Sequence, residues 1–321
     1  MNAPPLLVSF ASIDKYLEAL PPQYKIQYED EIKRLYTNGF PPIVSKLCLG
    51  VLFGYSSDFI YILAKKPSKF YRSFTLKQGK KTRKIFAPKV GLKVIQKWFA
   101  THLSNVIEFH PHVLGFVKGK SFADAAQLHI GARWVFSVDI VDFFPSISKE
   151  AVIEALIQTQ YYTSKAAELI SDLCCLNDAL AQGSPASPVL SNIIMKPFDE
   201  KLLELSKKYN IVVSRYADDI VFSGKDEFDA NLHKDLNELF AESCFTLNSQ
   251  KQYFADKNKG QRLKVHGLLV KEEHITLTKG YRNKLRAYKH MLNQEKVSEK
   301  DIERLKGHVK FSEFIESKRL N

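Results

Sequence analysis

Residues 211–223 read IVVSRYADDIVFS and place two adjacent carboxylates, Asp218 and Asp219, between two apolar runs. This pattern predicts two short strands joined by a tight turn. A buried hairpin does not favour two neighbouring anions unless a cation binds them, and Ala-Asp is a poor two-residue turn. The stretch therefore predicts a cation site at the tip of a buried hairpin, with an ordinary solvent-facing turn as the alternative.

A third carboxylate, Asp139, ends the apolar stretch 133–140 (RWVFSVDI), which predicts a buried strand. Taken alone, Asp139 could also cap a helix that follows the strand. Together with the hairpin pair it could hold two Mg²⁺ ions, because Mg²⁺ prefers oxygen ligands from a few carboxylates and from substrate phosphates. Two such ions about 4 Å apart stabilise the attacking and leaving oxygens of an in-line phosphoryl displacement.

A loop rich in Gly, Ser and Pro lies between these two features, at residues 182–188 (QGSPASP). Its backbone amides, placed ahead of a helix, could approach a phosphate or a base closely; an ordinary capped loop is the alternative. Ser187 and Pro188 suit the N-cap and first position of that helix. Pro197 predicts a kink or break further along it.

The rest of the chain mixes helices and strands without a regular βαβ alternation, which predicts an α+β fold. Helices are expected over 1–64, 91–110, 148–178 and 279–321, and strands over 70–88, 263–270 and 274–278. The last helical region is expected to have one apolar core face and one basic face.

Composition narrows the function classes. The chain has 321 residues, a formal net charge of +12 and 45% hydrophobic residues, which excludes a mainly disordered protein. Its apolar stretches are shorter than a membrane-spanning helix requires. Its four cysteines show no paired zinc spacing, so we expect a reduced, cytoplasmic protein.

The positive charge is concentrated in two regions. Residues 65–97 contain twelve Lys or Arg and no Asp or Glu, with aromatic residues among them. Residues 279–321 contain twelve Lys or Arg and six Asp or Glu. Cations with interleaved aromatic rings suit nucleic acid, since the cations contact phosphates and the rings stack on bases. A solvated basic face over core aromatics is the alternative.

Three segments in this order, SVDIVDFF, QGSPASP and RYADDIVFSG, resemble the palm of a reverse transcriptase. The resemblance runs from about residue 42 to residue 308 and includes KTRKIFAPK, HVLGFVKGKSF and KVHGLLV. The short length, the YADD form and GFVKGKSFADAAQLHIGA look most like the bacterial retron enzymes. No added endonuclease or maturase region is recognised, which argues against a group II intron protein. Three alternatives are another defence-associated reverse transcriptase, a diversity-generating one, and a catalytically idle RNA-binding scaffold.

The resemblance implies a right-hand polymerase that synthesises DNA on an RNA template. It implies an N-terminal helical extension at 1–42, fingers at 43–135, a palm at 136–278 and a helical thumb at 279–321. Asp139 and Asp218 would be the main ligands of two Mg²⁺ ions, with Mn²⁺ as a substitute. Asp219 would lie nearby, and the Ile140 carbonyl would complete the nucleotide-side ion.

The resemblance also implies a set of residues around the incoming dNTP. Arg83, helped by Lys77 or Lys84, would neutralise the triphosphate, and Gln182 would touch the nucleotide. Phe144 would lie under the sugar and reject a 2′-hydroxyl by size. The expected nucleotide-binding residues are Lys77, Arg83, Lys84, Asp142, Phe143, Phe144 and Gln182.

Two retron signatures are present in altered form. The expected Asn-Ala-x-x-His appears as AAQLH, so Ala126 and His129 match while Ala125 replaces the Asn. The expected Val-Thr-Gly appears as VHG, residues 265–267, with His266 replacing the Thr. The resemblance assigns RNA recognition to Ala126, His129, Val265, His266 and Gly267. His129 could equally be a core histidine.

A retron enzyme would copy a structured non-coding RNA into multicopy single-stranded DNA. Priming from a 2′-hydroxyl of that RNA would give a branched RNA–DNA product. The implied partners are this RNA, its DNA product, dNTPs and a separately encoded effector, a toxin or nuclease, in antiphage defence; no membrane partner is expected.

Overall fold

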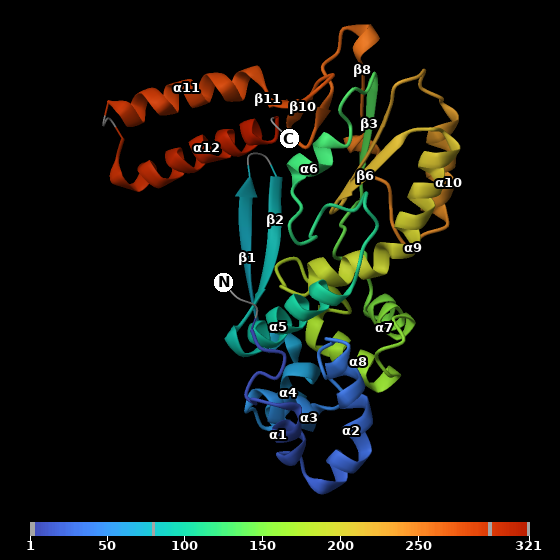
Figure 1. Cartoon of the computed structure of the whole chain (residues 1–321), viewed down its shortest axis with the longest axis vertical. Helices are drawn as coiled ribbons and strands as arrows, with labels where there is room; N and C mark the ends of the chain where they lie inside the picture. Colours follow the sequence, from blue (N-terminus) through green and yellow to red (C-terminus); the bar gives the residue numbers. More distant parts are fainter. Residues whose placement is uncertain (1–3, 79–80, 295–296, 320–321) are drawn as a thin grey trace. The chain divides into compact units, whose positions relative to one another are not determined.

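The predicted carboxylate hairpin forms as two antiparallel strands, β6 (Val212–Tyr216) and β7 (Asp219–Gly224). Strand β3 (Trp134–Asp139) pairs with β7, and β8 (Tyr253–Asp256) pairs with β3. The result is an antiparallel sheet of order β6-β7-β3-β8 (Figure 1). The Asp139 strand and the Asp218–Asp219 hairpin are therefore neighbours, as the sequence predicted.

The computed structural model describes residues 4–78, 81–294 and 297–319, and the chain divides into two compact units. The first unit comprises Met1–His110 and Asp142–Pro197. The second unit comprises Pro111–Val141 and Phe198–Asn321. These two units do not test the predicted division into N-terminal extension, fingers, palm and thumb, which stays a prediction.

The first unit is mainly helical. Its elements are α1 (Ile13–Glu18), α2 (Pro22–Thr37), α3 (Lys46–Phe53), α4 (Ser57–Lys65), η1 (Pro67–Phe70), β1 (Tyr71–Gln78), β2 (Lys81–Pro88), α5 (Val90–Val106), α7 (Lys149–Gln158), α8 (Ser164–Cys174), β4 (Cys175–Leu176) and β5 (Ala179–Leu180). Helix α5 buries its predicted stripe, with Leu92, Ile95, Phe99 and Leu103 at most 1% exposed. Its Trp98 is 2% exposed, so this unit has its own core around α5.

The second unit builds two layers on the sheet. Its remaining elements are α6 (Phe122–Gln127), α10 (Asn231–Ala241), η2 (Ser249–Lys251), η3 (Lys257–Lys259), β9 (Lys264–Val265), β10 (Leu268–Val270), β11 (Ile275–Leu277), α11 (Lys279–Asn293) and α12 (Glu299–Ser317). On one face, His233 of α10 packs on Phe136 with ring centroids 4.3 Å apart. On the other, Val135 and Val221 join a core cluster with residues of α6, β9–β11, α11 and α12.

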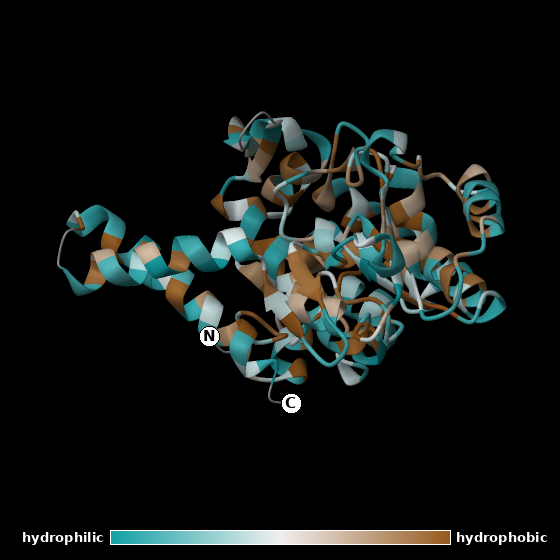
Figure 2. Cartoon of the chain, turned by 90° about the horizontal axis from the view of Figure 1, so that it is seen from above, coloured by the Kyte–Doolittle hydropathy of each residue, from teal (hydrophilic) through white to brown (hydrophobic). Residues whose placement is uncertain are grey.

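The helical pair α11–α12 has the predicted apolar face, but the predicted basic character belongs to α11, because α12 contains four Lys or Arg and five Asp or Glu. Figure 2 shows hydrophobic residues alternating with hydrophilic ones along both helices. Leu285 of α11 and Ile315 of α12 belong to the core cluster of the second unit. Lys318 at the end of α12 pairs with Asp124 of α6 at 2.6 Å. The pair is therefore fixed to its unit by an apolar face and by an ion pair.

Helix α9 (Ser187–Lys208) differs from the prediction at its start. It begins at Ser187, whose hydroxyl donates to the Ala181 carbonyl at 2.8 Å instead of capping the helix. The helix continues without a break through Pro197, where a kink or break was expected, and the kink stays a prediction. A proline removes one backbone hydrogen bond, and flanking helix on both sides can bridge that local loss.

No single helix in the described part of the chain is long and apolar enough to cross a membrane. Helices α3 and α4 meet that length and composition only as a pair, and they are bent by 116° at the break between them.

Candidate active site

The tip of the β6–β7 hairpin is a two-residue turn, because Tyr216 pairs directly with Asp219. Ala217 takes a φ of +59°, in the left-handed region that costs a residue with a Cβ about 1–2 kcal/mol. This explains why the sequence of the turn looked unfavourable: its backbone is held in a conformation that glycine would adopt more easily. Asp218 follows at the second turn position.

The register brings the predicted carboxylates together. Asp139, the last residue of β3, lies directly opposite Asp219, the first residue of β7. Opposite residues in an antiparallel pair project from the same face, where like charges destabilise each other. The Ile140 N–H donates to the Asp218 carbonyl at 3.1 Å, so the end of β3 is joined to the turn.

The carboxylate of Asp139 is already engaged by two side chains that the sequence analysis missed. The ammonium of Lys251 binds Asp139 Oδ1, and the side-chain amide of Asn248 donates to the same oxygen at 3.0 Å. The Asn248 N–H donates to the Asp139 carbonyl at 2.8 Å. No sequence signal marks either residue, since they follow a loop far along the chain from β3.

The pKa of Asp218 is shifted by its burial and by the other carboxylates at the hairpin tip. Burial raises its pKa above the ordinary value, and the negative charges of Asp219 and Asp139 raise it further, while Lys251 lowers it. Asp219 is half-exposed, and its Oδ2 lies 3.7 Å from Nδ1 of His266. The hairpin tip is thus a cluster of anions that the Lys251 ammonium partly neutralises.

Within residues 4–78, 81–294 and 297–319, no three His, Cys, Asp or Glu side chains converge closely enough to hold a metal ion. The predicted carboxylates share one end of the sheet but do not form a closed ligand cluster. Their chemistry nevertheless fits a hard divalent cation, because all the donors are oxygens. Lys251 shows that this end of the sheet binds positive charge.

The loop 182–188 lies against strand β2 within the first unit. The Phe86 N–H donates to the Gln182 carbonyl at 2.8 Å. Gly183 has a φ of +121°, and a Cβ there would lie 2.8 Å from both Ile85 Cγ2 and the Phe86 carbonyl oxygen. Gly183 therefore permits both the turn of the loop and its close approach to β2.

A buried glutamine, Gln96, supports this loop from the core. The Ser184 hydroxyl donates to Gln96 Oε1 at 2.9 Å. The Gln96 amide donates to the Tyr71 hydroxyl at 2.8 Å and to the Leu173 carbonyl at 2.7 Å. Gln96 is fully buried, and its position inside an apolar helical stripe is the signal that could have revealed it.

The basic side chains that we expected to bind the triphosphate lie on two different faces of the β1–β2 ribbon. Lys77 pairs with Thr82, and Lys84 pairs with Thr75, so these lysines share one face. Arg83 pairs with Leu76 and projects from the opposite face, because side chains alternate along a strand. Ile85, against which Gly183 packs, shares the face of Arg83. The ribbon thus places Arg83, and neither lysine, on the face of the loop.

The aromatic pair after Asp139 lies in a turn, so strand alternation does not govern its side chains. Asp142 is exposed and has a φ of +44°. Phe143 is 5% exposed, whereas Phe144 is half-buried, and their ring centroids are 5.3 Å apart. The turn separates the two rings into a core residue, Phe143, and a more accessible one, Phe144, and the nucleotide-binding role of each stays a prediction.

The residues assigned to RNA recognition are mostly core residues. Ala126 and Val265 belong to the buried cluster of the second unit. His129 is 1% exposed and bridges the hydroxyls of Ser214 and Ser223, each at 2.7 Å, so it joins β6 to β7. His129 is therefore the core histidine that the sequence left as an alternative. Contact with RNA stays a prediction for His266 and Gly267, which lie on the β9–β10 turn.

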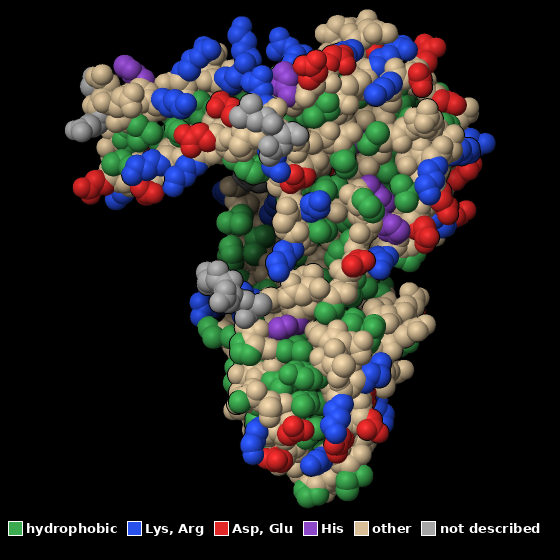
Figure 3. All heavy atoms as spheres, viewed as in Figure 1, with side chains coloured by type: hydrophobic (Ala, Val, Ile, Leu, Met, Phe, Trp, Pro, Cys, Tyr) green, Lys and Arg blue, Asp and Glu red, His purple; other side chains and the backbone are tan. Residues whose placement is uncertain are grey.

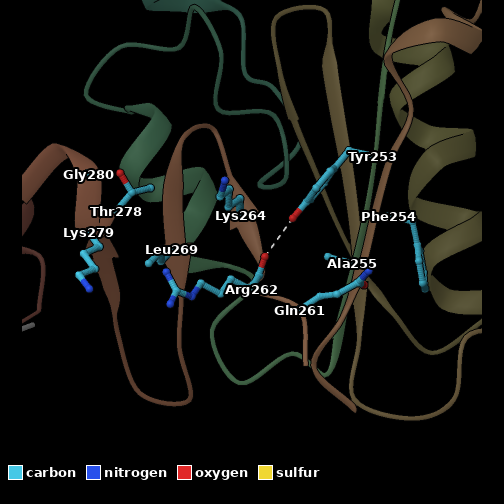
Figure 4. Close-up of a pocket in the computed structure, with 10 residues that line it drawn as sticks. All are labelled: Tyr253, Phe254, Ala255, Gln261, Arg262, Lys264, Leu269, Thr278, Lys279 and Gly280. Carbon is cyan, nitrogen blue, oxygen red and sulfur yellow. Dashed lines mark hydrogen bonds between the residues drawn. The ribbon is translucent and has the colours of Figure 1, made fainter. Parts of the chain in front are cut away.

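A cavity of about 610 Å³ opens between β8, β10 and the start of α11 in the second unit (Figure 4). We call it the cationic pocket, because its lining includes Arg262, Lys264 and Lys279 but no Asp or Glu. Figure 4 shows these three side chains around the opening, with Tyr253 donating to the Arg262 carbonyl at 3.0 Å.

Comparison with known proteins identifies the family. The profile of the family "Reverse transcriptase (RNA-dependent DNA polymerase)" matches residues 64–263. The chain is 29% identical to the Retron Ec86 reverse transcriptase of Escherichia coli over 252 residues, which cover 77% of each chain. It is 30% identical to the Retron Mx65 reverse transcriptase of Myxococcus xanthus, over 81% of this chain and 64% of that one.

The fold has more distant counterparts among solved structures. The telomerase of Candida tropicalis, truncated from its C-terminal domain, superposes with a TM-score of 0.48 and 10% identity. The match covers 70% of this chain and 61% of that one. By the match of its sequence over most of its length, the chain belongs to the reverse transcriptase (RNA-dependent DNA polymerase) family, and its relatives there are retron reverse transcriptases.

Proposed function

We propose that this protein is the polymerase of a retron, which copies a structured non-coding RNA into DNA primed from a 2′-hydroxyl of that RNA. The observation that carries the proposal is the register of β3 and β7, which sets Asp139 opposite Asp219 beside the Asp218 turn. Several carboxylates gathered at the end of a buried sheet destabilise the folded state unless a cation binds them. A divalent cation bound there could serve phosphoryl transfer.

In this proposal Asp139 and Asp218 hold the cation, with Asp219 beside them and the Ile140 carbonyl as a further oxygen donor. Mg²⁺ suits these donors, and Mn²⁺ is a possible substitute. When bound, the two ions neutralise the charge that develops on the attacking and leaving oxygens. Lys251, which binds Asp139 in this structure, would compensate the carboxylate in the absence of the metal.

The nucleotide-binding roles fall to the first unit. Arg83 would contact the triphosphate as a charge-assisted hydrogen-bond donor, and Gln182 and Gly183 would present the adjoining backbone to the dNTP. Two observations support this assignment: Arg83 shares a ribbon face with Ile85, and Gly183 packs on Ile85. Phe144 would lie under the sugar, since it is the accessible member of its pair.

Nucleic-acid binding would use the basic surfaces of both units. Figure 3 shows Lys and Arg side chains gathered over helix α11. The cationic pocket adds three cations, with no Asp or Glu in its lining, close to His266 and Gly267 in sequence. These surfaces would contact phosphates, which gives affinity that falls with salt.

The experiment that tests the retron assignment is sequencing of the nucleic acid that copurifies with the protein. A single defined RNA joined through a 2′–5′ branch to a DNA strand is the expected product, with the DNA absent from an Asp218→Asn preparation. Unbranched DNA would indicate another class of reverse transcriptase. RNA alone in both preparations would indicate a binding scaffold, and either result would refute the proposal.

A role in antiphage defence, with a separate toxin or nuclease as effector and with the cytoplasm as its location, is the remaining part of the proposal. It rests on the similarity to retron enzymes. The test is phage plating on cells that carry the enzyme, its RNA and the neighbouring gene. Protection that is unaffected by Asp218→Asn would contradict a role for DNA synthesis.

A further inference from the structure

Arg215 stands one residue before the Tyr-Ala-Asp-Asp turn and is fully buried in the second unit. Its guanidinium forms a bidentate pair with Asp199 of helix α9, with Nε to Oδ1 at 2.6 Å and Nη2 to Oδ2 at 2.6 Å. Asp199 is equally buried. Two charges without access to solvent are held here by close hydrogen-bond geometry, as a buried pair requires.

The third contact of the guanidinium reaches the turn itself. Nη1 of Arg215 donates to the carbonyl oxygen of Ala217 at 3.1 Å. Ala217 is the residue with a φ of +59°, and its carbonyl belongs to the peptide bond that carries Asp218. One side chain therefore links helix α9 to the strained peptide immediately before the carboxylates.

The backbone of Arg215 also forms hydrogen bonds with residues 112–114, which run along the edge of β6. Its N–H donates to the His112 carbonyl at 2.8 Å, and its own carbonyl accepts from the Leu114 N–H at 2.9 Å. Gly115 then passes so close to the turn that a Cβ on it would lie 2.1 Å from the Ala217 nitrogen. The chain at 112–115 thus packs directly against the turn.

We infer that Arg215 is a positioning residue for DNA synthesis: with Asp199 and the close passage of Gly115, it holds the Ala217–Asp218 peptide so that the carboxylates keep their places. The inference rests on the proposed catalytic role of Asp218 and Asp219. Apolar residues of similar volume can often replace a buried ion pair without loss of stability. Stability alone therefore does not account for the Arg215–Asp199 pair. What distinguishes this ion pair is the additional hydrogen bond from Arg215 to the Ala217 carbonyl in the turn.

The double variant Asp199→Leu/Arg215→Met tests whether the Arg215–Asp199 pair serves the stability of the fold or the position of the carboxylates. Leu has the shape of Asp, and Met follows the course of the Arg stem without its donors. The variant should unfold at or above the wild-type temperature and keep its KM for dTTP within about twofold. Its kcat should fall by about tenfold to a hundredfold, because small displacements of reacting groups have effects of that order. Amide hydrogen exchange at 216–219 should become faster.

Wild-type kcat in a double variant of wild-type stability would overturn the inference. If that variant fails to fold, Arg215→Lys replaces it, since it keeps a cation beside Asp199 and loses the donor to Ala217. Arg215→Lys should lower kcat more than Leu236→Ala, a core truncation on α10 that serves as the control for lost stability. Equal kcat in Arg215→Lys and the wild type would also overturn it.

The same assay includes Asp218→Asn, so that two failures can be told apart. If Asp218→Asn is inactive while both Arg215 variants keep the wild-type kcat, the positioning inference alone is wrong. If Asp218→Asn polymerises at the wild-type rate, the proposed active site is wrong and the inference falls with it.

Discussion

His129 makes the second unit sensitive to acid, and its buried site allows the size of the effect to be calculated. Burial, and to a smaller degree the nearby His266, lower the pKa of His129 to about 3 from an ordinary value of 6.5. The unfolded chain therefore binds the proton more readily than the folded one between these two values. Stability is complete above about pH 6.5 and is lost as the pH falls toward 3.

Between pH 7.5 and pH 5.0, this single group should reduce the free energy of unfolding by about 2 kcal/mol, at 1.36 kcal/mol per pKa unit. For a unit of this size, that loss lowers the melting temperature by roughly 4–8 °C. The assay is differential scanning calorimetry of the wild type and His129→Gln at the two pH values. The variant, which cannot titrate, should show a fall that is smaller than the wild-type fall by this amount.

A control for lost packing is Val135→Ala, which truncates a buried residue of the same sheet and keeps the histidine. It should be less stable than the wild type at pH 7.5 and should lose the same further amount at pH 5.0. An identical pH dependence in the wild type and His129→Gln would refute the account of a neutral histidine buried between two serines.

Three further predictions concern nucleotides and RNA. Phe144→Ala should raise the use of GTP relative to dGTP by about tenfold to a hundredfold, whereas Phe143→Ala should lower stability without changing that ratio of kcat/KM. Gly183→Ala should raise the KM for dNTPs, because its Cβ must displace the loop from β2; an unchanged KM would count against the loop as a nucleotide contact. Neutralising the three cations of the cationic pocket to Gln should reduce the log–log salt slope of RNA binding by about 0.7–0.9 for each lost contact, and an unchanged slope would exclude the pocket from the RNA interface.

The hairpin and strand β3 were predictable because periodicity and turn chemistry are local, whereas strand β8 of the same sheet was not predicted. The alternation of residues 211–223 defined β6 and β7, and the apolar run before Asp139 defined β3. The carboxylates indicated that the Asp139 strand and the hairpin lie together, and the register shows that β3 pairs with β7. The start of α9 was misplaced by one residue because Ser187 uses its hydroxyl within the preceding loop.

The polar partners of the site were not predictable, since each depends on contacts far apart in sequence. Lys251 and Asn248 reach Asp139 from more than a hundred residues away, and neither belongs to a motif. Asp199 lies in a helix where a polar residue is usually exposed, and Gln96 is the exception, because its place inside an apolar helical stripe marks it. The helper role of Lys77 or Lys84 beside Arg83 required the strand register, which places both lysines on the other face.

The measurement that tests the central claim most directly is primer extension on an RNA template by Asp139→Asn and Asp218→Asn, with Mg²⁺ and again with Mn²⁺. Both variants should lose DNA synthesis while they retain the fold and the RNA affinity of the wild type. Loss of a repelled carboxylate at position 218 should, if anything, raise the melting temperature, because its neighbours are anions. Extension at a rate near that of the wild type by either variant would contradict the assignment of these carboxylates to catalysis.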